Sequence, residues 1–192
     1  ELMRRAAEIA DRALPAGLAA LRAGVTEYDV EIALTEAMRN LGGKPAFCIV
    51  AAGANGAEPH HLSDDTVIRE GDVVVMDFGC TIEGYYSDIT RMAAVGQASD
   101  EAKEAYRLVH RAFMAGRDAI RPGVAAQETD RAARRVIAEG GFGEAFMHRL
   151  GHGIGCKGHE EPNQVEGNTR PLEVGNCFSI EPGVYFPGRF GI

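Results

Sequence analysis

The sequence runs Gly71-Asp72-Val73-Val74-Val75-Met76-Asp77-Phe78-Gly79 in its first half, a pattern typical of a buried β-strand that ends on a carboxylate. A related stretch, Gly175-Asn176-Cys177-Phe178-Ser179-Ile180-Glu181-Pro182-Gly183, follows 104 residues later. The two stretches place Glu181 in the position of Asp77. The same buried strand, with its carboxylate, is therefore predicted twice.

An internal duplication surrounds these strands. When the sequence is shifted by 99 residues, Arg4–Val25 aligns with Lys103–Val124, and nine of the 22 positions are identical. A chain of 192 residues is long enough for one compact domain with its own core. We therefore predict a single domain, 1–192, built from two pseudo-symmetric halves at about 1–98 and 99–192.

Each half shows the same order of predicted elements, a long helix, a shorter helix and then strands. The predicted helices are Leu2–Leu21, Tyr28–Leu41, Asp100–Ile120 and Gln127–Glu139. The predicted strands are Phe47–Ala51, Val73–Phe78, Tyr85–Ala94 and Cys177–Tyr185. This order indicates an α+β fold in which the strands of both halves share one sheet covered by helices.

Composition and charge exclude several classes of protein. Lys and Arg number 20 against 28 Asp and Glu, a net charge of −8, and no basic run suggests nucleic acid or an anionic membrane as a partner. No apolar run approaches the roughly 18 residues of a membrane span. The four cysteines lie far apart and form no CxxC pair, which favours a reducing, cytoplasmic setting over a structural zinc site.

Two aspartates are predicted to face each other across a hairpin. A hairpin symmetric about Ile82 and Glu83 would make Asp77 and Asp88 direct cross-strand partners, with Cβ atoms about 5 Å apart. Two carboxylates so close repel unless one is protonated or a cation lies between them. A metal site is the preferred interpretation, and a solvated acidic hairpin is the alternative.

Histidines in a glycine-rich stretch add candidate ligands. His152 and His159 lie in Gly151-His152-Gly153-Ile154-Gly155-Cys156-Lys157-Gly158-His159, where backbone and ligand can approach closely. His60 is a further candidate, whereas His110 and His148 are interpreted as surface or core residues. The chain has no GxSxG elbow, and no strand-turn-helix context surrounds Gly151–Gly155, so a serine hydrolase and a dinucleotide fold are both disfavoured.

Five motifs together resemble the catalytic domain of the pita-bread (creatinase/aminopeptidase-like) metallopeptidases. They are Asp77-Phe78-Gly79, Ser87-Asp88-Ile89-Thr90-Arg91, His152-Gly153-Ile154-Gly155, His159-Glu160-Glu161-Pro162 and Glu181-Pro182-Gly183-Val184-Tyr185. The second and fifth motifs resemble the Xaa-Pro dipeptidase (prolidase) and Xaa-Pro aminopeptidase branch more than the methionine aminopeptidases. The resemblance implies two similar halves and a curved antiparallel sheet covered by helices.

The resemblance also implies a set of site residues. Asp77 would bind one divalent ion, His152 would bind the other, and Asp88 and Glu181 would bind or bridge both. Manganese or cobalt is expected from the carboxylate-rich ligands, with zinc as an alternative. A hydroxide activated by the two metals would cleave the Xaa-Pro bond at the N-terminus of a dipeptide or short peptide. Glu181 would also shuttle a proton, and His60 and His159 would flank the substrate.

The remaining expectations combine this resemblance with the composition. The partner is a proline-containing peptide, with no nucleic acid and no membrane, and the protein is expected to be a cytoplasmic homodimer. Several prolidases of this family carry an Arg after the His-Glu-x-Pro motif, whereas this chain has Asn163, which puts dipeptide-only specificity in doubt. The segment is expected to be truncated at both ends. A methionine aminopeptidase-like enzyme and a catalytically silent binding module are the alternatives.

Overall fold

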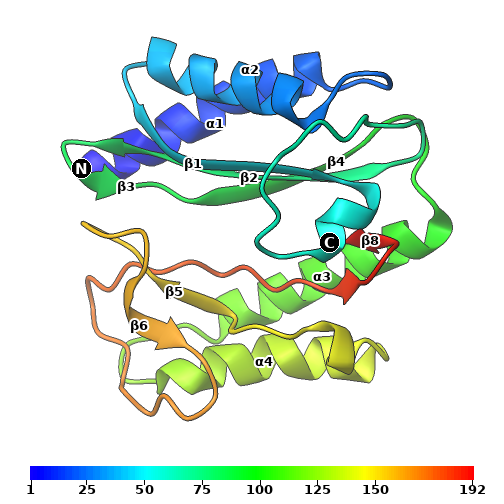
Figure 1. Cartoon of the computed structure of the whole chain (residues 1–192). Helices are drawn as coiled ribbons and strands as arrows, with labels where there is room; N and C mark the ends of the chain where they lie inside the picture. Colours follow the sequence, from blue (N-terminus) through cyan, green and yellow to red (C-terminus); the bar gives the residue numbers. More distant parts are fainter.

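The computed structural model describes all residues, 1–192, and its helices lie on the outside with the strands between them (Figure 1). The helices are α1 (Leu2–Ala20), α2 (Glu27–Asn40), α3 (Asp100–Asp118) and α4 (Ala126–Glu139). Two short 3₁₀ helices, η1 (Gly53–Ala57) and η2 (Gly143–Ala145), complete the helical elements. All four predicted helices are confirmed within two residues at each end.

Local sequence explains where the helices begin. Thr26 and Asp29 form a capping box at the start of α2, in which the Thr26 hydroxyl accepts the Asp29 N–H and the Asp29 carboxylate accepts the Thr26 N–H. The hydroxyl of Ser99 caps α3 by accepting the N–H of Ala102. These contacts satisfy N–H groups that have no partner inside the helix.

The two halves repeat each other in backbone pairing. Gly24 donates to the carbonyl of Ile68 at 2.9 Å in the first half, and Gly123 donates to the carbonyl of Leu172 at 2.8 Å in the second. The long helices also pack through equivalent glycines. A Cβ on Gly17 would lie 2.5 Å from Leu34, and one on Gly116 would lie 3.4 Å from Ala133, the counterpart of Leu34. The pseudo-symmetry predicted from the sequence therefore extends to the contacts.

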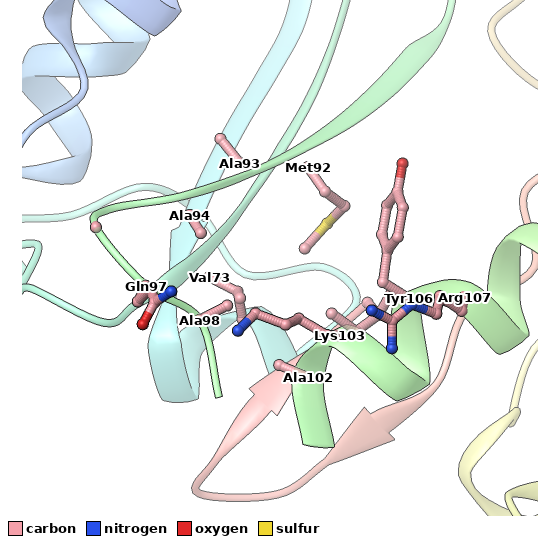
Figure 2. A pocket seen from close by; sticks show the side chains of 12 residues that line it. Val73, Met92, Ala93, Ala94, Gln97, Ala98, Ala102, Lys103, Tyr106 and Arg107 are labelled. Carbon is pink, nitrogen blue, oxygen red and sulfur yellow. The ribbon is translucent and has the colours of Figure 1, made fainter. Parts of the chain in front are cut away.

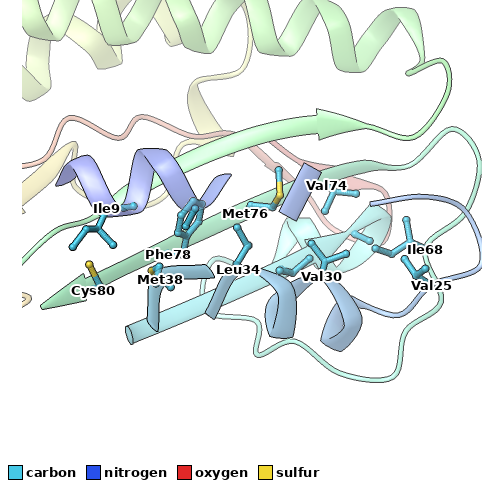
Figure 3. Close-up of a cluster of buried hydrophobic side chains, with 14 of the residues drawn as sticks. Ile9, Val25, Val30, Leu34, Met38, Ile68, Val74, Met76, Phe78 and Cys80 are labelled. Atoms are coloured by element: carbon cyan, nitrogen blue, oxygen red, sulfur yellow. The ribbon is translucent and has the colours of Figure 1, made fainter. Parts of the chain in front are cut away.

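The largest sheet belongs to the first half. It contains β1 (Lys44–Ala52), β2 (Val73–Ile82), β3 (Tyr85–Tyr86) and β4 (Ile89–Ala94), and the central strand β2 pairs antiparallel with each of the others. Helices α1 and α2 cover the outer face of this sheet (Figure 1). Apolar side chains such as Leu34, Met76 and Phe78 form the core between them (Figure 3).

The strands of the second half form separate short ladders instead of joining that sheet. Strand β5 (Gly151–Gly153) pairs with β6 (Glu160–Gln164), and β7 (Tyr185–Phe186) pairs with β8 (Phe190–Gly191). The prediction that both halves share one hydrogen-bonded sheet is therefore wrong in this detail, although the strands pair antiparallel as expected. No helix of the chain is both long enough and apolar enough to cross a membrane.

The predicted strand Cys177–Tyr185 is not continuous. Its first part runs beside β5, with one bridge between Gly153 and Phe178 and a hydrogen bond from the Ser179 N–H to the His152 carbonyl at 2.9 Å. Pro182 has no N–H to donate, so the ladder cannot continue through it. Regular pairing resumes only at β7.

The predicted hairpin register is also wrong. Strand β2 continues to Ile82, and the turn consists of Glu83 and Gly84, which both have positive φ, 51° and 85°. Such a two-residue turn suits the twist of a hairpin. The residue directly opposite Asp77 is therefore Thr90 and not Asp88. Asp77 and Asp88 are diagonal neighbours on one face, since side chains of antiparallel strands alternate between faces.

Candidate active site

Four predicted ligands come from four separate parts of the chain. Asp77 lies on β2, Asp88 lies between β3 and β4, His152 lies on β5 and Glu181 lies just before β7. A hydrogen bond from the Tyr86 N–H to the Gly155 carbonyl, 2.9 Å long, connects β3 to the end of β5. This contact brings the carboxylates of the first half against the histidine strand of the second.

Asp88 projects from a constrained stretch of backbone. The neighbouring Ser87 is buried, and its backbone N–H donates to the carbonyl of Cys80 at 2.9 Å. A Cβ on Gly79 would lie only 2.0 Å from the Ser87 carbonyl oxygen, so this position of β2 has room for glycine alone. The Asp-Phe-Gly motif therefore supplies the carboxylate of Asp77. Its glycine also lets the backbone of Ser87 approach β2 closely, which positions Asp88.

His152 lies between two carboxylates. Its Nε2 is 3.4 Å from Oδ2 of Asp88 and 3.2 Å from Oε1 of Glu181. Its Nδ1 is 3.0 Å from the Gly153 carbonyl, which can only accept, so Nδ1 carries a proton and Nε2 faces the carboxylates. Burial lowers the pKa of His152, but the hydrogen bonds to Asp88 and Glu181 outweigh burial and raise it to about 10.

Asp77 completes a group of three carboxylates. Burial, and then the charges of Asp88 and Glu181, raise the pKa of Asp77 to about 7 despite a hydrogen bond from Thr90. The Thr90 hydroxyl donates to Oδ1 of Asp77 at 2.9 Å. Burial is the larger cause, and two neighbouring carboxylate charges add to it, so the ionised form of Asp77 is disfavoured unless a cation lies nearby. Cations would therefore be stabilised here.

Glu181 is fixed from both sides. The hydroxyl of Ser179 donates to Oε1 of Glu181 at 2.7 Å, and the backbone N–H of Glu181 donates to the carbonyl of Leu150 at 2.9 Å. Burial raises the pKa of Glu181, but the hydrogen bonds from His152 and Ser179 outweigh burial and leave the pKa below its ordinary value. The carboxylate is therefore ionised near neutral pH and has a defined orientation.

The structure brings His159 next to this group. The rings of His159 and His152 have centroids 4.0 Å apart and meet edge to face. His60 is exposed, and no contact in the structure joins it to the carboxylates. Burial is the largest cause of the lowered pKa of His148, and the charge of His60 is the smallest. His61, the neighbour of His60, turns away and hydrogen-bonds Glu27 at 2.7 Å.

Sequence reasoning missed several residues of this region. His148, interpreted as a surface or core residue, lies with its Nε2 2.8 Å from the hydroxyl of Tyr185. Because the His148 Nδ1 donates to the carbonyl of Arg149, Nε2 accepts the hydrogen bond from Tyr185. Ser179 was also missed. Its only signal in the sequence is its place two residues before Glu181, on the same face of an extended segment.

A groove on another part of the surface does not coincide with these residues. It measures about 440 Å³ and lies between β4 and α3, where Met92, Ala98 and Tyr106 form part of its wall (Figure 2). None of the predicted site residues lines this groove. The candidate site is therefore defined by the convergence of titratable groups and not by cavity size.

The residues at the candidate site fit divalent ions. The three carboxylates offer hard oxygen ligands, and the imidazole offers one nitrogen ligand when it is neutral. Such a ligand set suits manganese, cobalt or zinc. The Nδ1–H of His152 is held by the Gly153 carbonyl, which leaves the Nε2 lone pair available when the ring is neutral. The charges of Asp88 and Glu181, which add to the effect of burial on the pKa of Asp77, fit the same interpretation.

Solved structures share this architecture. The X-Pro aminopeptidase from Thermotoga maritima superimposes with a TM-score of 0.97 at 41% identity, covering 100% of this chain and 55% of that one. The chain therefore has the pita-bread fold of Xaa-Pro peptidases, as predicted.

Sequence comparisons identify the family. The model of metallopeptidase family M24 matches residues 1–192. A probable dipeptidase PepE from Mycobacterium bovis is 49% identical over 88% of this chain and 45% of its own length. The Xaa-Pro dipeptidase of Lactobacillus delbrueckii subsp. lactis is 42% identical over 99% of this chain and 52% of its own length. The chain belongs to metallopeptidase family M24 and spans about half the length of these curated relatives.

Proposed function

We propose that Asp77, Asp88, His152 and Glu181 form the metal-binding active site of an Xaa-Pro exopeptidase. The observation that carries the proposal is the position of His152 Nε2 between Asp88 and Glu181, 3.4 and 3.2 Å from their oxygens. Asp77 adds a third carboxylate, and the charges of both others contribute to raising its pKa. Membership in family M24 and similarity to an Xaa-Pro dipeptidase support the same function.

We further propose two divalent ions at this site, manganese or cobalt by ligand hardness, with zinc as an alternative. Asp77 would hold one ion, His152 the other, and Asp88 and Glu181 both. Ions held there would polarise a scissile carbonyl and lower the pKa of a bound water. The protein contributes the fixed positions of the ligands. The Ser179 hydroxyl orients Glu181 by a hydrogen bond, and the Gly153 carbonyl orients His152 in the same way.

Three side chains of the chain are proposed to act on the substrate. Glu181 has one oxygen held by Ser179 and is ionised, so it can accept a proton from the attacking water and carry it to the leaving nitrogen. Burial and the charge of His152 lower the pKa of His159, which keeps its ring neutral with an N–H to donate. His159 and His60 would stabilise the negative charge that develops on the carbonyl oxygen.

The proposed substrate is an Xaa-Pro dipeptide or a short peptide with proline in second position. Asn163, which follows Pro162, is partnered within the chain, since its Nδ2 donates to Oε1 of Glu161 at 2.7 Å. A neutral and occupied amide is a weak anchor for a peptide carboxylate. We therefore expect peptides longer than two residues to be accepted as well.

A homodimer and a cytoplasmic location remain parts of the proposal. The location is supported by the cysteines, all four of which are free. The dimer follows from the family resemblance and is tested by measuring the mass of the protein in solution.

The function is tested by metal depletion and restoration. The purified protein is stripped with a chelator and then supplied separately with manganese, cobalt, zinc or magnesium. Cleavage of an Xaa-Pro dipeptide, an Xaa-Pro-Yaa tripeptide and a matched Xaa-Ala peptide is followed. The proposal predicts activity only after metal is restored and only on proline-containing peptides. Equal activity of the stripped protein, or equal cleavage of the alanine peptide, would overturn it.

A further inference from the structure

A second cluster of titratable groups lies outside the candidate active site, at the start of α2. The side chain of Glu27 is fully buried. Its Oε1 accepts the backbone N–H of Ala52 at 2.7 Å and the side-chain amide of Asn55 at 3.0 Å. Its Oε2 lies 2.7 Å from Nε2 of His61 and accepts the N–H of Asp64 at 3.2 Å. One carboxylate thus meets four donors from β1, η1 and the loop after η1.

This cluster has the residue types of a cation site, but its carboxylate oxygens are bonded to protein donors. We call Glu27 with its four donors the Glu27 clamp. Ligand atoms of Glu27, His61 and Asp64 lie within 4.8 Å of one another. Both oxygens of Glu27 are already engaged by protein donors, and the Asp64 carboxylate accepts the N–H of Thr66 at 2.7 Å. Burying a carboxylate is costly unless hydrogen bonds replace its water, and here four of them do. The four donors explain the burial of Glu27 without a metal.

The clamp holds both ends of the segment that carries His60. Asn55, before His60, is bound through its side chain, and His61, after it, is bound through its ring. Between them the backbone makes two tight turns, with the Glu58 N–H bonded to the Asn55 carbonyl at 3.0 Å and the His61 N–H bonded to the Glu58 carbonyl at 2.9 Å. Helix η1 also contacts β7 and β8 of the second half, so the segment lies between α2 and the part of the chain that carries Tyr185.

We propose that Glu27 is a positioning residue, which acts through His61 and Asn55 to hold His60 at the edge of the active site. The inference rests on the proposed function, in which His60 faces the substrate. Because the His60 side chain is exposed and makes no hydrogen bond, its position depends on the backbone turns on either side of it, which the contacts of Asn55 and His61 hold. A displacement of about 1 Å in a group that faces a reacting atom can cost up to about 100-fold in rate.

A double-mutant cycle tests the inference in the native protein. The turnover number kcat on an Xaa-Pro dipeptide and the bound metal are measured for the wild type, Glu27→Gln, His60→Ala and the combined variant. We expect Glu27→Gln to lower kcat about 10-fold or more with unchanged metal content. In the His60→Ala background, Glu27→Gln should have no further effect, because the group that it positions is absent. Glu36→Gln, an exposed position on the same helix, is the matched control and should leave kcat unchanged.

Several results would overturn the inference. An equal loss of kcat from Glu27→Gln in both backgrounds would show a general structural role, and loss of metal would make the cluster a metal site. If His60→Ala leaves kcat unchanged, the proposed role of His60 fails and the inference fails with it. If Glu27→Gln does not fold, His61→Ala replaces it in the cycle, and the same dependence on His60 is required.

Discussion

Two contacts join His152 and Glu181, residues 29 positions apart in the sequence. Directly, Nε2 of His152 lies 3.2 Å from Oε1 of Glu181. Indirectly, the hydroxyl of Ser179 donates to that same oxygen at 2.7 Å and accepts the backbone N–H of His152 at 3.0 Å. Ser179 thus fixes the carboxylate relative to the histidine strand, and the proposed metal site depends on this geometry.

Replacing Ser179 by Ala should weaken metal binding or lower activity by about 10- to 100-fold, the usual effect of losing a group that orients a ligand. The Glu181 carboxylate keeps its partner His152 but loses the hydroxyl that holds Oε1. Metal affinity by calorimetry and kcat/KM on an Xaa-Pro dipeptide measure the effect. Thr169→Ala, which removes an exposed hydroxyl without a hydrogen-bond partner, is the control. Wild-type metal affinity and kcat/KM in Ser179→Ala would contradict the role of Ser179 in orienting Glu181.

The substitution His159→Ala should lower the rate of peptide hydrolysis by about 100-fold while leaving bound metal unchanged. One donor to a developing oxyanion contributes about this much. The ring of His159 stacks edge to face on His152 but lies outside the group of carboxylates. Metal content and kcat are measured together, with His110→Ala on the exposed face of α3 as the control. Metal lost in step with activity would make His159 a ligand instead.

The capping box of α2 is expected to contribute to stability in a pH-dependent way. Thr26→Ala should reduce the free energy of unfolding by about 1 kcal/mol. The hydrogen bonds from Thr26 hold the pKa of Asp29 below its ordinary value of 3.8, so its contribution is present above that pH and is lost on further acidification. Urea denaturation of wild type and Asp29→Asn from pH 7 to pH 2 should show a stability difference that shrinks at the acidic end. A difference independent of pH would contradict the capping box.

The cysteines should differ sharply in reactivity toward a thiol reagent at pH 8. Burial, and then the charges of Glu31 and Asp77, raise the pKa of Cys48 to about 12, so almost none of it is thiolate. Cys80 is buried and Cys48 is half-buried, whereas Cys156 and Cys177 are exposed. Mass spectrometry after brief labelling should find Cys156 and Cys177 modified first. Rapid labelling of Cys48 in the folded protein would contradict its raised pKa and its half-buried position on β1.

The helices and the duplication could be predicted from the sequence because their signals are local or repeated. Thr26 with Asp29 marked the start of α2, and the paired motifs marked Asp77 and Glu181 as equivalents. The hairpin register could not be predicted, because Glu83 adopts a positive φ that its residue type does not favour. That difference of two positions moved the partner of Asp77 from Asp88 to Thr90.

Long-range side-chain contacts were the other feature beyond the reach of sequence patterns. The pairing of Glu27 with His61, 34 residues away, has no periodic signal, and only the tertiary fold brings them together. The hydrogen bond between His148 and Tyr185 likewise depends on the tertiary fold and has no signal in the sequence. By contrast, the glycines around His152 predicted close backbone approach correctly, since a Cβ on Gly151 would lie 2.0 Å from the Ser179 carbonyl oxygen.

The central claim is that the carboxylates around His152 hold metal, and the metal bound by Asp77→Asn tests it most directly. Bound manganese and cobalt are counted by elemental analysis after equilibrium dialysis. The comparison includes the wild type and Asp65→Asn, an exposed control without a hydrogen-bond partner. The account predicts tight binding by the wild type and by Asp65→Asn and its loss in Asp77→Asn, because an uncharged amide replaces a ligand. Unchanged metal content and affinity in Asp77→Asn would contradict the account.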